Sequence, residues 1–410
     1  MSDRTTHTAV RMSGRDPHEP GRSATPLELL FDLTFVIAFG VAAGELAHFL
    51  AEDHVWDGIV GFAFATFAVS WAWINFAWFA SAYDTDDWIF RLTTMVQMVG
   101  VIILALGLPD MFESLLEDEH MANQVMVLGY VVMRVPMLLQ WYRASRQDPA
   151  RARTCQVFMV TLAVSQAAWV VLALVETSIP VFFAFALPVI LVEMAGPYVA
   201  EQIHEGTPWH AHHIAERYGL LVIIALGEGL IGGAATLSAI ISTEGWTIDV
   251  AVLGLAGVGV TFGMWWTYFV IPSGEILHAH RARGFSWGYG HIPLFGALVA
   301  VGAGLHAAAL YLEHHSELSA TATVLTVVVP LGLYVALLFV LYALLTHTLD
   351  PFHVLLVAGS AAVLAVGTVM VAAGAPLTWS LLVVAFTPWV TVIGYETVGH
   401  RHNEDVLASL

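Results

Sequence analysis

The sequence predicts an all-α polytopic membrane protein of about twelve transmembrane helices, arranged as two parallel six-helix repeats. The prediction rests on an apolar composition, a succession of segments of membrane-spanning length, and a match between the two halves of the chain. Hydrophobic residues make up 58% of the 410 residues and charged residues only 11%, and the mean hydropathy is +0.75. Such a chain has too little polar sequence to cover the surface of a soluble domain.

Twelve apolar segments are each long enough to cross about 30 Å of hydrocarbon as a helix. We expect these helices at residues 26–50, 56–81, 88–109, 121–142, 153–175, 180–200, 215–240, 247–271, 289–311, 320–346, 352–373 and 377–397. Short connectors are typical of antiparallel neighbours in one bundle. The predicted organisation is a disordered cytoplasmic tail (1–25), a first six-helix half (26–200), a histidine-rich cytoplasmic linker (201–214), a second six-helix half (215–397) and a cytoplasmic tail (398–410).

The two halves match in order, which predicts an internal duplication. "FDLTFVIAFG" (31–40) aligns with "YGLLVIIALG" (218–227), "TFAVSWAWINF" (66–76) aligns with "TFGMWWTYFVI" (261–271), and Pro188 aligns with Pro388. Six spans per half is an even number, so both halves enter the membrane from the same side, as in transporters with parallel repeats and a site between the repeats. The alternative is that apolar helices resemble one another by composition alone.

The orientation follows from the arginines, since the chain contains no lysine. Eleven of the fourteen arginines lie in residues 4–22, 143–153, 281–283 and 401, and the connectors of the opposite face hold acids and histidines. The positive-inside rule therefore predicts that both termini are cytoplasmic. No cleavable signal is expected, because the first 25 residues have no apolar core.

Charge and cysteine content exclude several classes of protein. The net charge of −19 argues against a nucleic-acid partner. Cys155 is the single cysteine, so the sequence predicts neither an intrachain disulfide nor a thiolate metal site.

Glu28 and Asp32 stand one helical turn apart at the start of the first span and face the same way. Thr25 and Pro26 suit the N-cap and the first helical position, where an acid also favours the helix dipole, so Glu28 has a purely structural explanation. Asp32 lies a full turn deeper, where ionisable groups are expensive and a functional role becomes the default interpretation.

The seventh span places His213, Arg217 and Glu228 on one face of a helix. Glu228 lies near the middle of the span between two glycines, which let a neighbouring helix or a substrate approach closely. An acid at that depth is poorly explained by solvation, so we interpret Glu228 as functional. Glu216 and Arg217, near the cytoplasmic end, could instead form an ordinary interfacial pair.

Arg134 is the only arginine near the centre of a span, and its repeat counterpart carries no charge. An arginine in hydrocarbon requires an acidic partner, and by depth that partner is Glu228, Asp32 or Glu193. A structural ion pair that locks the two halves together competes here with a role in transport.

Histidines gather on the predicted cytoplasmic side, at 204, 210, 212 and 213, at 278 and 280, and at 400 and 402. These spacings can bind a metal ion or respond to pH, but no cysteine accompanies them, so we predict hydrated loops and neither a metal site nor a cofactor. Trp71 and Trp73 are assigned to interfacial belts without chemistry.

"TPLELLFDLTFVIAF" (25–39) and "HHIAERYGLLVIIALGEGLIGG" (212–233) resemble the two signature segments of the low temperature requirement protein A (LtrA) family of bacterial membrane proteins. The resemblance implies a multi-pass protein of the bacterial cytoplasmic (inner) membrane, associated by name with growth in the cold. It supplies no substrate. The signature positions it implies are Glu28, Asp32, Glu216, Arg217 and Glu228.

We expect a secondary, proton-coupled carrier in which a cavity between the halves holds Asp32 and Glu228, one of which changes protonation. The predicted substrate or proton pathway comprises Asp32, Glu228, Glu28, Arg134, Glu193, Glu216, Arg217 and His213. A proton or ion channel using the same acids is the first alternative, and a membrane sensor or scaffold linked to cold growth is the second. No HExxH, GxSxG or nucleophile and base at fixed spacing is present, so no enzyme is predicted. Expected partners are the lipid bilayer, a small solute or ion such as the proton, and a second copy of the chain in a homodimer.

Overall fold

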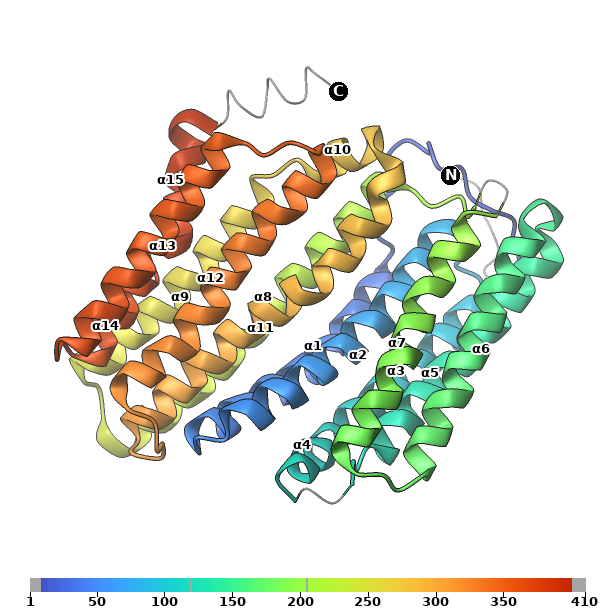
Figure 1. Cartoon of the computed structure of the whole chain (residues 1–410). Helices are drawn as coiled ribbons and strands as arrows, with labels where there is room; N and C mark the ends of the chain where they lie inside the picture. Colours follow the sequence, from blue (N-terminus) through green and yellow to red (C-terminus); the bar gives the residue numbers. More distant parts are fainter. Residues whose placement is uncertain (1–8, 118–119, 204–205, 400–410) are drawn as a thin grey trace. The chain divides into compact units, whose positions relative to one another are not determined.

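The structure is a computed structural model that describes residues 9–117, 120–203 and 206–399. Throughout these residues it consists of helices and connectors, without a strand (Figure 1). Eleven helical segments are long and apolar enough to cross a membrane, and the 34-residue helix α8 (Ala211–Glu244) covers the remaining predicted span. The predicted all-α membrane fold with about twelve spans is therefore confirmed.

The chain divides into two compact units. Unit 1 comprises the residues up to Ala38 together with Ala68–Arg217, and unit 2 comprises Phe39–Phe67 and the residues from Tyr218 onward. Helices α1 (Pro26–Ala51), α2 (Val55–Tyr83) and α8 each contribute residues to both units. The units differ from the predicted halves in that residues 39–67 belong with the second half of the chain.

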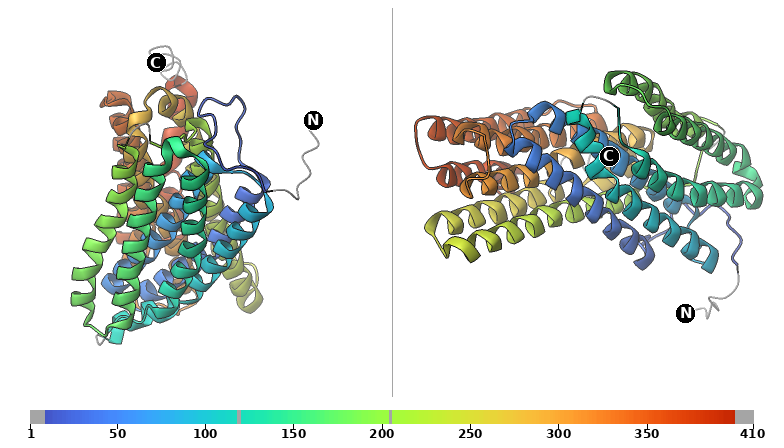
Figure 2. Two further views of the ribbon diagram at one scale, coloured as in Figure 1. Left: turned by 90° about the vertical axis from the view of Figure 1, so that its right-hand side faces the viewer. Right: turned by 90° about the horizontal axis from the view of Figure 1, so that it is seen from below.

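Within unit 1, the helices pack in chain order: α3 on α5, α5 on α6 and α6 on α7 (Figure 2, blue-green to green). Their bounds are α3 (Trp88–Leu106), α4 (Leu108–Glu117), α5 (Gln124–Gln147), α6 (Ala152–Leu174) and α7 (Ile179–Glu201), with a 3-10 turn at Pro149–Arg151. Helices α3 and α5 approach closely at two glycines, since a Cβ atom on Gly100 would lie 2.7 Å from the carbonyl oxygen of Gly129.

Within unit 2, α11, α12, α13 and α14 pack in chain order, and α9 lies against α14 and α15. Their bounds are α9 (Ile248–Phe269), α10 (Ser273–Ala279), α11 (Gly284–Leu312), α12 (Ala320–Thr346), α13 (Pro351–Ala372), α14 (Leu377–Val384) and α15 (Thr387–Gly394), with a 3-10 turn at Arg281–Arg283 and a π-helical turn at Tyr395–Gly399. The order of packing is the same in the two units. A duplication would produce this order, but the repeat stays a prediction.

The last predicted span is interrupted between α14 and α15. Pro388 has no N–H group to donate to the carbonyl of Val384, so the helix cannot continue its regular hydrogen bonding there. The N–H of Trp389 donates to the carbonyl of Phe386 at 3.1 Å instead. Pro188, its predicted counterpart, lies inside the unbroken helix α7.

The predicted disordered tail requires a correction over residues 9–25, because this segment packs on unit 1. The N–H of Val10 donates to Asp87 Oδ2 at 2.9 Å, and the N–H of Met12 donates to Gln147 Oε1 at 2.6 Å. Met12 itself is fully buried. The polar composition of the segment suggested disorder, but side chains at the ends of helices capture its backbone N–H groups. Residues 1–8 and 400–410 of the predicted tails lie outside the described residues.

Asp84 follows α2 and is buried in the connector to α3. Its Oδ1 accepts a hydrogen bond from the N–H of Asp86 at 2.8 Å, and Arg22 Nη2 lies 3.9 Å from Oδ2. Burial raises the pKa of Asp84 to about 6, the negative charge of Glu28 acts in the same direction, and Arg22 opposes it.

We therefore expect the titration of Asp84 to lower the free energy of unfolding as the pH rises from about 4 to about 6. In that window the folded protein holds a proton that the unfolded chain, with an aspartate pKa near ~3.9, has released, so stability falls as the pH rises, by about 2 to 3 kcal/mol. Asp84→Asn should remove this component. Thermal unfolding in detergent across pH 4.5 to 7.5 tests it, with exposed Asp86→Asn as control; identical pH profiles for wild type and Asp84→Asn would contradict it.

Candidate functional site

Arg217, in the first turns of α8, is fully buried and binds two carboxylates of α1. Its Nε donates to Asp32 Oδ2 at 3.1 Å and its Nη2 to Asp32 Oδ1 at 2.5 Å, and its Nη1 donates to Glu28 Oε1 at 2.8 Å. The planar guanidinium thus forms a two-bond fork with one acid and a third bond with the next. Charge-assisted bonds of this geometry are among the strongest in proteins. The interfacial-pair interpretation of Arg217 is wrong.

The N-terminus of α1 positions both acids. The Thr25 hydroxyl accepts from the N–H of Glu28 at 3.3 Å, and the Glu28 carboxylate accepts from the N–H of Thr25 at 2.7 Å, which is a capping box. Asp32 follows one turn later on the same face, and both acids are completely buried. Glu28 therefore serves as a helix cap and as an ion-pair partner at once.

Trp73 and His213 complete the cluster. Trp73 Nε1 donates to Asp32 Oδ1 at 2.6 Å, and His213 Nε2 lies 3.3 Å from the Glu28 carboxylate. Trp73 has no exposed surface, so its assignment to an interfacial belt is wrong. The sequence offered no signal for its role, because tryptophans at membrane interfaces and tryptophans that donate to buried acids look alike in an apolar helix.

Glu216, next to Arg217 on α8, is exposed and takes no part in this cluster. Its Oε2 accepts a hydrogen bond from the N–H of Ala24 at 3.2 Å. Of the signature positions that belong to unit 1, Glu216 therefore holds the N-terminal segment, whereas Glu28, Asp32 and Arg217 bind one another.

Arg134 pairs with Glu193, one of the three acids that the sequence left open. Arg134 Nη2 lies 3.3 Å from Glu193 Oε1, and both side chains are buried. Tyr130 accepts a further bond from Arg134, and Trp169 Nε1 donates to Glu193 Oε2 at 3.0 Å. Both charged residues belong to unit 1, so the pair links α5 to α7 within one unit and does not join the two halves.

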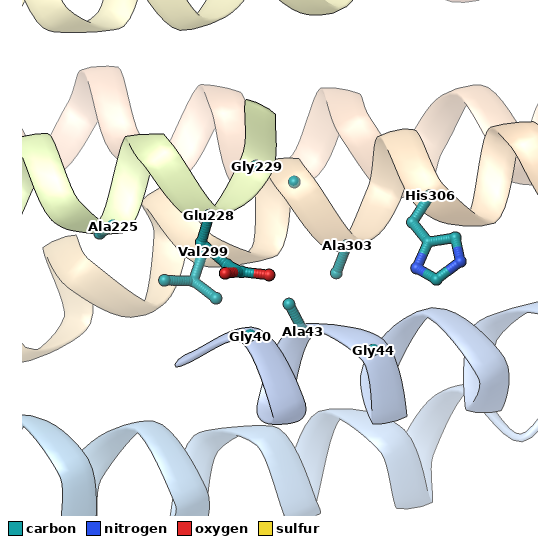
Figure 3. A pocket seen from close by; sticks show the side chains of 10 residues that line it. Gly40, Ala43, Gly44, Ala225, Glu228, Gly229, Val299, Ala303 and His306 are labelled. Atoms are coloured by element: carbon teal, nitrogen blue, oxygen red, sulfur yellow. The ribbon is translucent and has the colours of Figure 1, made fainter. Parts of the chain in front are cut away.

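Glu228 belongs to unit 2 and lies in a different environment. It lines a pocket of about 120 Å³ among α1, α8 and α11 (Figure 3). The lining residues are small and apolar apart from two: Gly40, Ala43, Gly44, Ala225, Glu228, Gly229, Val299, Gly302, Ala303 and His306. Within the described part of the chain, the Glu228 carboxylate has no hydrogen-bond or ion-pair partner.

Glycines shape this pocket. A Cβ atom on Gly40 would lie 2.6 Å from the Glu228 Oε1 atom, so the carboxylate rests directly on the backbone of α1. A Cβ atom on Gly302 would lie 3.0 Å from the Cα atom of Gly229, which brings α8 and α11 into close contact. The predicted close approach to the backbone beside Glu228 is thus found at Gly229.

Asp32 and Glu228 belong to different units, and the cavity that the sequence predicts for both acids stays a prediction. Asp32 is bound to Arg217 in unit 1, whereas Glu228 lines its own pocket in unit 2. Sequence reasoning also missed His306, which lines the same pocket, and His48, whose ring centroid lies 5.7 Å from that of His306. The available signal was a histidine inside each of two predicted spans.

The histidine-rich connectors gain no metal site from the structure. Across residues 9–117, 120–203 and 206–399, no three or more histidine, cysteine, aspartate or glutamate side chains are grouped to hold a metal ion. His210 Nε2 lies 3.0 Å from the carbonyl oxygen of Glu19, which it can bind as a donor. His204, His400 and His402 lie outside the described residues.

The fold and these sites define a polytopic α-helical membrane protein with buried ionisable groups. The family model described as "Bacterial low temperature requirement A protein (LtrA)" matches residues 23–387, and the chain belongs to this family. The chain is 28% identical over 296 residues to the "Uncharacterized protein RA0937" of Rhizobium meliloti (strain 1021), a match that covers 68% of this chain and 67% of the relative. No solved structure matches the chain.

The Arg217 cluster predicts a large loss of stability when its cation is removed. Arg217→Gln leaves two buried carboxylates without a counter-charge, and breaking a buried pair in this way costs about 3 to 5 kcal/mol. Arg217→Lys should fall between wild type and Arg217→Gln, because an ammonium group cannot form the fork with Asp32. Thermal unfolding in detergent measures both.

Arg91→Gln is the matched control for that series, since its ion pair with Asp86 is exposed and worth less than about 1 kcal/mol. An Arg217→Gln protein that unfolds at the same temperature as Arg91→Gln would show that the cluster does not stabilise the fold.

The different environments of the acids predict selective chemical modification. A hydrophobic carbodiimide reacts with protonated carboxyl groups, so we expect it to modify Glu228 while Asp32 and Glu28, bound by Arg217, stay unmodified. Peptide mass spectrometry of the labelled protein checks this, with Glu228→Gln as the blank. Equal labelling of Asp32 and Glu228 would refute the distinction between the two sites.

Proposed function

We propose that this protein is a proton-coupled secondary carrier in which Glu228 binds and releases the coupling proton. The observation that carries the proposal is an acid in the middle of a membrane helix, beside a pocket and without a cation. Three buried acids inside the spans of unit 1 are each matched by an arginine: Glu28 and Asp32 by Arg217, and Glu193 by Arg134.

A buried negative charge is costly unless a cation or several hydrogen bonds compensate it. Since no described group compensates Glu228, the ionised and neutral forms of this carboxyl depend strongly on what enters the pocket. That sensitivity is what a coupling residue needs, because its proton must be held in one state of the transport cycle and released in another.

The size of the pocket favours a proton or a small ion as its occupant. A volume of about 120 Å³ has room for several water molecules, since one water needs about 10 to 15 Å³ of space measured in this way. The proposal assigns the coupling ion to this pocket and does not assign the site of the solute.

We infer an orientation with both termini in the cytoplasm of a bacterial inner membrane, supported by where the arginines lie. In unit 1, Arg143 contacts Asp87 and the carbonyl of Val10, so the N-terminal segment shares an end with the start of α3 and the end of α5. In unit 2, Arg283 donates to the carbonyl of Leu345 near the end of α12. Within each unit, arginines thus gather at the end that the positive-inside rule assigns to the cytoplasm.

The test is proton flux into sealed liposomes that contain the purified protein, measured with a trapped pH dye under an imposed potential. We expect wild type to carry protons when its solute is supplied, and Glu228→Gln to lose at least tenfold of that flux. Glu193→Gln is the matched control for the removal of a buried carboxylate charge outside the pocket; its fold must first be verified, because it disturbs Arg134.

Three outcomes separate the functional classes. Flux that requires an added solute supports the carrier. Flux without any solute that still disappears in Glu228→Gln indicates a proton channel built on the same acid. Absence of flux across a panel of solutes, from a protein that unfolds normally, would reject transport in favour of a sensor.

A further inference from the structure

We propose that His306 and His48 carry protons between the Glu228 pocket and the end of unit 2 where α1 and α11 end. The inference rests on the proposed function, since it describes how protons reach the carboxyl group that the carrier uses. It adds two residues that neither the signature segments nor the ion-pair clusters contain.

The pocket has one titratable group toward each end. Figure 3 shows the Glu228 carboxylate between α8 and α1 and the His306 ring farther along the pocket, beyond Ala303. Among the described lining residues, no other side chain carries a titratable group. Water in this space would therefore contact an acid and an imidazole, with a nearly apolar wall between them.

The face of α1 that lines the pocket continues along the helix toward the end of the unit. Gly40, Gly44 and His48 recur every four residues on α1 and so lie along one face. The first two line the pocket, and His48 follows one turn later. At a rise of ~1.5 Å per residue, the distance from Gly40 to His48 along the helix is about 12 Å.

The two imidazoles are close enough to exchange a proton directly or through one water molecule. Their ring centroids lie 5.7 Å apart in an edge-on arrangement, with His306 partly buried and His48 exposed. An imidazole accepts a proton on one ring nitrogen and releases one from the other, so each transfer restores the neutral ring and no other reactant is needed. The proton taken up at His48 ends on the Glu228 carboxylate.

The route ends among polar connector residues. The carbonyl of Ala51, at the end of α1, accepts from the N–H of Glu317 at 2.7 Å and from the Ser316 hydroxyl at 3.2 Å. This connector also holds the exposed His315, which lies 3.6 Å from Glu313. Glu45 and Glu52, about one turn before and after His48 along the chain, are further titratable residues near it, and the N–H of Glu52 donates to the carbonyl of His48 at 3.0 Å. In the inferred orientation, this end faces away from the cytoplasm.

The test compares proton flux in liposomes for His306→Gln, His48→Gln and the control His347→Gln, an exposed histidine that follows α12 at the opposite end of unit 2. We expect flux to fall at least tenfold in the first two variants and to stay within twofold of wild type in the control. Imidazole added to the medium on the side of His48 should restore part of the flux to His48→Ala, which a purely structural role of His48 would not produce.

Two further measurements exclude misfolding as the cause of a lost flux and distinguish the histidine route from the proposed carrier function. Carbodiimide labelling of Glu228 and the unfolding temperature should match wild type in both histidine variants. Flux that depends on Glu228 but is unchanged in His306→Gln and His48→Gln would overturn the histidine route and leave the carrier intact. Flux that is absent in wild type would remove the proposed function itself, and the route with it.

Discussion

The fork between Arg217 and the two acids of α1 sets the packing of unit 1 where two helices begin. It fixes the first turns of α8 against the first turns of α1. A cation with two partners and an N-cap with two functions leave little freedom in either helix.

Much of this arrangement follows from helix periodicity and from the free-energy cost of placing a charge in the membrane. The spans follow from apolar length, the shared face of Glu28 and Asp32 follows from their spacing, and the need of Arg134 for an acid follows from its depth. What could not be predicted is which distant residue completes each pair. Sequence alone did not choose Glu193 over Asp32 as the partner of Arg134. Nor did it place the Trp73 indole on the Asp32 carboxylate and not at the membrane interface, because these contacts join segments that only tertiary packing brings together.

The acids of the spans also show that one residue type occupies two different environments in a single membrane protein. Glu193 receives a guanidinium and an indole N–H and acts as a structural ion. Glu228 is bound by neither a guanidinium nor an indole N–H among the described residues, and a pocket with space for water lies beside it. The sequence assigned both to one pathway because it records depth and charge, whereas function depends on whether the charge is compensated.

The contact between Gly40 and the Glu228 carboxylate has a consequence for how such a protein can be silenced. The acid keeps its place because a side chain is missing opposite it, so a single added methyl group at position 40 would displace the carboxylate while every ionisable residue stays in the chain. The proposed carrier is therefore vulnerable to the gain of a few atoms as much as to the loss of a charge. A comparison limited to the acidic residues of two sequences would not reveal which of the two proteins has space beside its acid.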